Sequence, residues 1–187
     1  MTHKNTFFKY SLLALSLGMM SSAAQASDGD VTITGSINAG TCDVLPADQH
    51  KVVELGSVGV DLFTEGGAGT RSTPVPFQIT LTDCVSNADV NGSSVASVAV
   101  QFSTFFQENN GLAGLTPSST ATGVGVRLFD SAGNAINVDG TTNYNITALT
   151  STAGDVIMDF SAAYESTTAN PVPGTAEAVA QFTLTYL

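Results

Sequence analysis

Side chains that commonly carry catalysis are sparse in this sequence. One of its two histidines falls in the first few residues, which leaves His50 as the only one in the rest of the chain. This excludes a metal site built from several histidines, and a Ser-His-Asp triad would rest on that single residue. The 16 carboxylates are scattered, and Trp, a common sugar-stacking residue, is absent. We therefore expect no enzyme, no metal and no cofactor, and we expect His50 to be exposed.

The first 26 residues differ in composition from the rest of the chain. Two lysines precede an apolar run over residues 11–20, and small residues then lead to Ala26. This order is typical of a secretory signal peptide, which predicts cleavage between Ala26 and Ser27. The apolar run is shorter than the ~20 residues that a membrane span needs, so we expect export without membrane insertion.

The two cysteines, Cys42 and Cys84, both lie in the part of the chain that would be exported. An oxidising compartment favours a disulfide between them. The rival interpretation is a redox-active pair, but such pairs usually show a Cys-x-x-Cys spacing, which this sequence lacks. We predict a structural disulfide that contributes about 4 kcal/mol in the chain-entropy model.

The net charge argues against phosphate-rich partners. It is −11 at pH 7 and becomes −11 − 2 = −13 once the two lysines of residues 1–26 are removed. Nucleic acids and anionic membranes bind clustered Lys and Arg, which this chain does not have. We expect neither as a partner.

Short β-type runs follow one another from residue 30 to the end of the chain, separated by Gly, Asn, Asp, Ser and Pro. No stretch shows convincing helical periodicity. Because each run has one apolar face to bury, the pattern predicts an all-β, two-sheet sandwich. The expected strands cover residues 31–37, 77–82, 95–106, 123–129, 156–164 and 178–186.

The first of these runs is unusual for its place near the start of the exported chain. It alternates strictly, so that Val31, Ile33, Gly35 and Ile37 share one face. Terminal segments are usually polar and frayed. Two interpretations stay open on periodicity alone: the run is a first strand of its own sandwich, or it fills a groove elsewhere.

Four blocks of the sequence resemble the type 1 fimbrial subunit family of Gram-negative bacteria. They are residues 29–35 with Cys42 downstream, residues 77–84, residues 123–130, and residues 174–187. The last block places a glycine, Gly174, fourteen residues from the end and a tyrosine, Tyr186, in the penultimate position, as that family does. The resemblance covers the whole exported chain.

This resemblance implies an incomplete immunoglobulin-like β-sandwich that is completed by donor-strand exchange. It divides the chain into a signal peptide (1–26), an N-terminal donor-strand extension (27–38) and a pilin domain (39–187). The donor residues would be Val31, Ile33, Gly35 and Ile37. A periplasmic chaperone would bind the C-terminal strand, in which the resemblance singles out Gly174, Phe182, Leu184 and Tyr186.

The implied function is that of a structural fimbrial subunit which supports adhesion. Its partners would be the chaperone, an outer-membrane usher and other pilus subunits, on a route through the periplasm to the cell surface. Only Ser27 to Asp30 precede the donor run, a short extension that leaves a minor adapter or terminator subunit as an alternative. A secreted carbohydrate-binding sandwich is a further alternative, which the lack of Trp disfavours.

Overall fold

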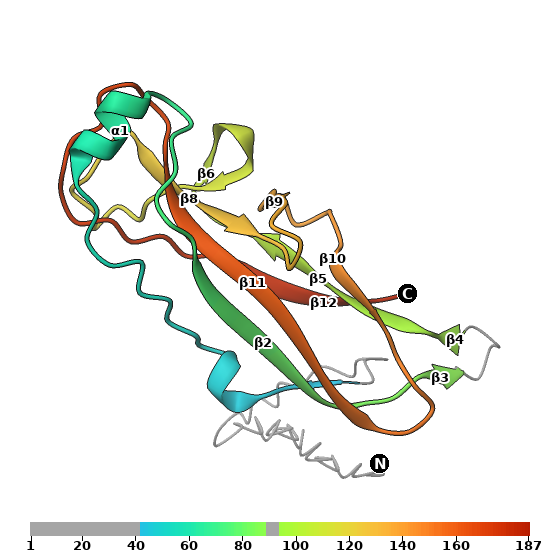
Figure 1. Ribbon diagram of the computed structural model, residues 1–187. Helices are drawn as coiled ribbons and strands as arrows, with labels where there is room; N and C mark the ends of the chain where they lie inside the picture. The colour runs from blue at the N-terminus through green and yellow to red at the C-terminus, as the bar shows by residue number, and fades with distance from the viewer. Residues whose placement is uncertain (1–41, 89–93) are drawn as a thin grey trace, which may run out of the picture. The chain divides into compact units, whose positions relative to one another are not determined.

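Strands dominate the structure, as the repeated β-type runs predict (Figure 1). The computed structural model describes residues 42–88 and 94–187. The predicted signal peptide, its Ala26–Ser27 cleavage site and the donor residues Val31, Ile33, Gly35 and Ile37 lie outside the described residues. The described residues belong to the part of the chain that the sequence assigns to the sandwich.

The larger sheet is antiparallel throughout and has the order β1-β2-β11-β8-β7-β6, with β9 paired to β8. Its two longest strands, β2 and β11, form the centre of the sheet. The bounds of its strands are β1 Asp43–Val44, β2 Val75–Cys84, β6 Gln107–Glu108, β7 Leu112–Ala113, β8 Val124–Phe129, β9 Ala135–Ile136 and β11 Gly154–Ser166.

The second sheet has three antiparallel strands in the order β10-β5-β12. They are β5 Ser97–Ser103, β10 Tyr144–Ala148 and β12 Gln181–Tyr186. A two-stranded ladder of β3 Asn87–Ala88 and β4 Ser94–Val95 is separate from both sheets. The strand runs expected from the sequence cover β2, β5, β8, β11 and β12 in their central parts, and the ends differ by a few residues.

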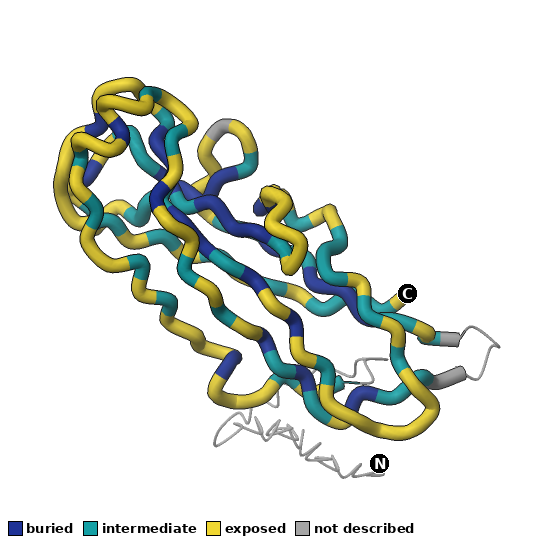
Figure 2. Tube along the Cα trace, viewed as in Figure 1, coloured by how far each residue is buried: buried dark blue, intermediate teal, exposed yellow. Residues whose placement is uncertain are grey.

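The core lies between the two sheets, so the predicted sandwich is confirmed (Figure 2). Phe160 of β11 stacks on Phe77 of β2 with ring centroids 5.6 Å apart. It also meets Phe102 of β5 edge-on at 5.0 Å. The fully buried side chains of both sheets include Ile79, Leu81, Val98, Val100 and Met158.

The all-β fold class is confirmed, and the described residues add one short helix that the sequence pattern did not indicate. The helix α1 spans Val60–Gly66, and 3-10 turns cover Pro46–Asp48 and Asn109–Gly111. Seven residues make about two helical turns, too few for an apolar periodicity to be recognised. Phe63 is the only residue of α1 that is buried. Among the described residues, none of the helices has the length and apolar character of a membrane span.

Candidate functional site along the last strand

The final strand, β12, carries an apolar face that the sandwich only half covers. Phe182, Leu184 and Tyr186 pack against the buried core but keep part of their surface in solvent. The intervening Gln181 and Thr183 are exposed. This is the alternation that the sequence predicted for residues 178–186, and it leaves one side of the core incompletely sealed.

The hydrogen-bond ladder of β12 shows which backbone groups face outward. Leu187 and Ser97 exchange both backbone bonds, at 2.9 and 3.0 Å. Bonded and non-bonded pairs alternate in an antiparallel ladder, so Thr185 and Thr183 also face β5. The N–H and C=O groups of Phe182 and Leu184 therefore point away from β5. Within residues 42–88 and 94–187, β12 has β5 as its only paired strand.

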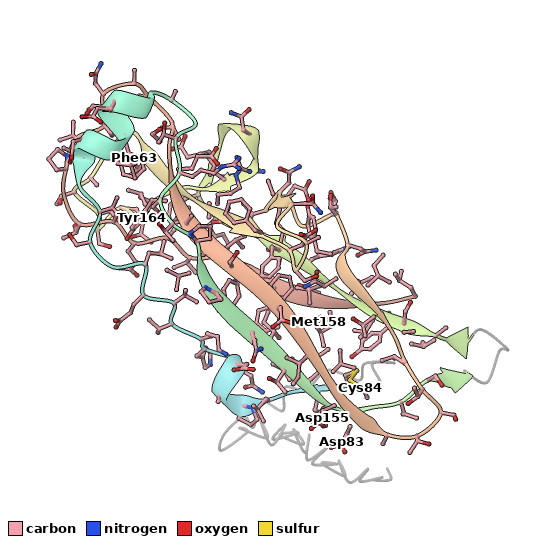
Figure 3. The ribbon with its side chains drawn as sticks, in the orientation of Figure 1. Phe63, Asp83, Cys84, Asp155, Met158 and Tyr164 are labelled. Carbon is pink, nitrogen blue, oxygen red and sulfur yellow. A yellow bond between two sulfur atoms is a disulfide. The ribbon has the colours of Figure 1, made fainter. Side chains whose placement is uncertain are left out.

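The predicted disulfide is confirmed, and the end of β12 lies beside it. Cys42, directly before β1, is bonded to Cys84, the last residue of β2. Figure 3 shows Cys84 and the sulfur bond at this end of the sandwich. The Tyr186 hydroxyl accepts a bond from Cys42 N at 3.2 Å and donates one to Cys42 O at 3.3 Å. The C-terminal strand is thereby tied to the first described residue of the chain.

Gly174 lies outside β12, in the segment that leads into it. That segment runs along the stretch before β8: Thr120 N and Ala121 N both donate to Thr175 O at 3.0 Å. A Cβ atom on Gly174 would lie 2.5 Å from Ala121 N and 2.5 Å from the Thr120 hydroxyl. Close backbone approach is therefore what requires glycine here. The sequence pattern groups Gly174 with the strand itself, because only the structure reveals that Thr120 and Ala121 lie beside it.

A buried ion-pair cluster in the larger sheet was not predicted from the sequence. Arg127 of β8 bonds both oxygens of Glu165 on β11, at 3.0 and 3.1 Å. Both residues are about 95% buried. Arg71 bonds Glu165 Oε2 at 2.6 Å and lies over the Phe129 ring. Arg127, a charged residue within the apolar run 123–129, was the available sign of a buried ion pair, but its partner Glu165 is distant in sequence.

Opposing effects set the pKa of Glu165. Burial of the carboxylate raises its pKa, but the hydrogen bonds and positive charges of Arg127 and Arg71 outweigh burial and hold the pKa below its usual range. A carboxylate held in its ionised form by two arginines is a poor general acid or base at neutral pH. We therefore assign a structural and not a catalytic role to the cluster of Glu165, Arg127 and Arg71.

Catalytic groups do not converge in the described residues. His50 is exposed in the turn after residues 46–48. A hollow of about 450 Å³ between residues 55–62 and 72–75 has Asp61 as the one titratable side chain in its lining, so it holds no acid–base pair. No group of three His, Cys, Asp or Glu side chains that would suit a metal ion occurs in the part of the chain that the structure describes.

Comparison with known proteins assigns this arrangement to a family. The model of the family described as "Fimbrial protein" matches residues 31–187. The chain is 30% identical over 185 residues to long polar fimbria protein A of Salmonella typhimurium, covering 98% of this chain and 97% of that protein. It is 33% identical over 180 residues to the type-1 fimbrial protein A chain of Escherichia coli K12, covering 94% of each.

A solved structure has the same fold. The crystal structure of the P pilus rod subunit PapA matches with a TM-score of 0.62 and 21% identity, covering 79% of this chain and 99% of that chain. This likeness shows the immunoglobulin-like sandwich that the sequence resemblance implies. The family model and the relatives together show that the chain belongs to the fimbrial protein family, whose members are structural subunits of pili and not enzymes.

Proposed function

We propose that this subunit polymerises in a chaperone-usher fimbria by donor-strand complementation and thereby supports bacterial adhesion. One observation carries the proposal: the outer edge of β12 at Phe182 and Leu184 has no strand beside it among the described residues. The apolar face of the same strand is half-exposed. An exposed edge next to exposed apolar surface is a template for an added strand.

The segment best suited to fill this edge is residues 31–37 of another copy. Val31, Ile33, Gly35 and Ile37 would face the core, and the backbone would pair with the outward groups of β12. Gly35 would lie where the acceptor is shallow. The donor run 31–37 is one residue longer than the six-residue strand β12, so one donor is long enough to cover the whole strand. The extension 27–38 and the domain 39–187 are thus assigned different tasks in the fibre.

Before assembly, a periplasmic chaperone would cover β12, contacting Phe182, Leu184 and Tyr186, while Gly174 sets the course of the chain into the strand. An outer-membrane usher would then exchange the chaperone for the next donor, on the way to the cell surface. One relative is named as a probable major fimbrial subunit, in Escherichia coli O157:H7. This name favours a position in the shaft over that of an adapter or terminator.

Deletion of residues 28–37 tests the proposal, because the two interpretations of this segment predict opposite results. The truncated subunit should still be recovered with its chaperone, since its sandwich and β12 are intact. Mixed with wild-type chaperone-bound subunits, it should accept a wild-type donor and never donate. The measurement is the ladder of heat-labile polymers on a denaturing gel.

A milder variant tests the same segment by a single substitution instead of a deletion. Gly35→Leu places a branched side chain where the donor backbone must approach the acceptor closely, and should slow donation while acceptance is unchanged. Overpacking of this kind costs about 1 to 3 kcal/mol. Loss of folding in the deletion variant, or normal donation by it, would overturn the role assigned to residues 28–37.

A further inference from the structure

Two aromatic rings stand in solvent at the turn between β5 and β6. Phe105 is 78% exposed and Phe106 is 42% exposed. Val179, just before β12, is 45% exposed. The Thr104 hydroxyl donates to Val179 O at 2.8 Å, which places the backbone of Val179 beside the residue that precedes Phe105. We name Phe105, Phe106 and Val179 the aromatic turn. Exposed apolar side chains on neighbouring segments are typical of an interaction site.

The aromatic turn is anchored to the sandwich at several points. Phe106 N donates to the Thr104 hydroxyl at 3.3 Å, and Gly114 N of the neighbouring loop donates to Phe106 O. Arg127 Nη1 donates to Asn110 O at 2.7 Å and so holds the turn between β6 and β7. Arg127 is itself held by buried Glu165. The fold thus fixes these rings in solvent, where exposure to water is unfavourable.

The short length of chain between the donor run 31–37 and Cys42 indicates which part of the next copy covers the aromatic turn. In a complete immunoglobulin sandwich the seventh strand runs antiparallel to its neighbour. A donor placed this way beside β12 ends with Ile37 at the Gln181 end, next to Val179. From Ile37 to Cys42 there are five residue steps, which span at most roughly 18 Å. The end of the donor copy that carries Cys42 must therefore lie close to the aromatic turn of the acceptor.

We propose that the aromatic turn is the docking surface for the Cys42 end of the next copy of this chain. The proposal rests on the donor-strand function above and adds a second contact to it. The Cys42 end carries its own exposed apolar side chain, Leu187, 45% exposed and adjacent to Tyr186. The net charge of the chain makes copies repel. An uncharged contact is therefore the kind that two copies of this chain can make.

This contact joins two different surfaces of the same molecule. Such a head-to-tail contact repeats from copy to copy, and it forms an open filament when the rotation does not close. The donor strand alone links two subunits through a short tether. Docking at the aromatic turn fixes the angle between them.

Photo-crosslinking in assembled pairs tests the proposal. A benzoyl-phenylalanine replaces Phe105 in a chaperone-bound subunit that lacks residues 28–37, and wild-type chaperone-bound subunit is added as donor. Irradiation should give dimers that survive heating, and peptide mapping should place the link in the donor copy near Cys42 or Leu187. The same probe at Ile157, on β11 and 58% exposed, is the control and should give no such dimers.

The outcomes separate this proposal from the donor-strand function. Heat-labile pairs without heat-stable crosslinks from position 105, or links to another part of the donor copy, overturn the docking proposal and leave donor-strand exchange standing. Absence of heat-labile pairs overturns both. Because Phe105 is largely exposed, its replacement leaves the core of the sandwich unchanged.

Discussion

Gly174 directs the chain into β12 by the absence of a side chain. Its segment crosses from the loop before β8, where Thr116 N donates to Glu177 O at 2.7 Å, to the second sheet. The crossing is tight enough that backbone atoms of residues 120 and 121 occupy the space of a Cβ atom. Gly174 thus permits the close crossing that precedes β12.

We predict that Gly174→Ala destabilises the subunit by about 1 to 3 kcal/mol, because the new methyl group overpacks against backbone. The measurement is the midpoint of urea unfolding of the oxidised protein. Gly154→Ala is the matched control, since a Cβ atom there meets nothing within 4 Å. Equal midpoints for the two variants would contradict the packing argument.

Glu165 makes part of the stability depend on pH. Its folded-state pKa is depressed by Arg127 and Arg71 despite burial. A depressed carboxyl pKa contributes stability that is fully present above the unfolded pKa, about 4.3, and is lost as pH falls through the folded value. The contribution is therefore constant near neutral pH and disappears on the acid side.

We predict that Glu165→Gln lowers stability at pH 7 by about 3 kcal/mol or more, because it leaves the buried Arg127 without its carboxylate. The variant should also lose less stability between pH 5 and pH 3 than wild type does, because this range spans the usual glutamate pKa of about 4.3. Urea unfolding at several pH values measures both effects. Glu177→Gln, at a position outside the buried cluster, serves as control, and parallel acid curves for wild type and Glu165→Gln would refute the linkage.

At the scale of elements, β12 combines a core-facing side with an outward edge, and Tyr186 belongs to both. Tyr186→Ala removes a half-buried ring, which should cost roughly 2 kcal/mol, about half the value for full burial. We therefore predict a lower yield of the chaperone-bound subunit from the periplasm.

Tyr186→Phe keeps the ring and loses only the hydroxyl bonds to the Cys42 backbone, for about 1 kcal/mol. We expect its chaperone-bound yield to lie between those of wild type and Tyr186→Ala. A wild-type yield for the alanine variant would argue against a role of this ring in chaperone binding.

The strands were predictable from sequence where alternation and flanking turns agree. The run 77–82 lies inside β2, and the run 156–164 lies inside β11. The pairing of Cys42 with Cys84 was predictable from the export signal and the small number of cysteines. These features depend on local pattern or on composition, which a single sequence contains.

Contacts between distant segments were not predictable in the same way. Arg127 looks like an outward-facing residue of its strand until Glu165, on the neighbouring strand, is placed beside it. Phe105 and Phe106 of the aromatic turn likewise fall within the predicted strand run 95–106, although β5 ends at Ser103. In both cases the contacting residue lies on another element, and sequence spacing does not predict which element that is.

At the scale of the whole molecule, the described part of the chain is a sandwich in which β12 is an edge strand with a half-exposed apolar face. β12 pairs with β5 on one side, and its half-exposed apolar face adjoins the core that Phe102, Phe160 and Phe77 form. Under the proposed donor-strand function, a fibre built from such units would need no covalent link between subunits. Its strength would come from the strand that each copy inserts into the next.

The most direct test of donor-strand complementation adds a synthetic peptide of residues 27–38 to the chaperone-bound subunit and follows backbone amide exchange by NMR. We predict that the peptide displaces the chaperone and that the amides of Phe182 and Leu184 become as protected as those of Thr183 and Thr185, which already face β5. A peptide with Gly35→Leu should bind more weakly. If the chaperone stays bound, or if the amides of Phe182 and Leu184 exchange as exposed amides do in the peptide complex, donor-strand complementation at β12 is contradicted.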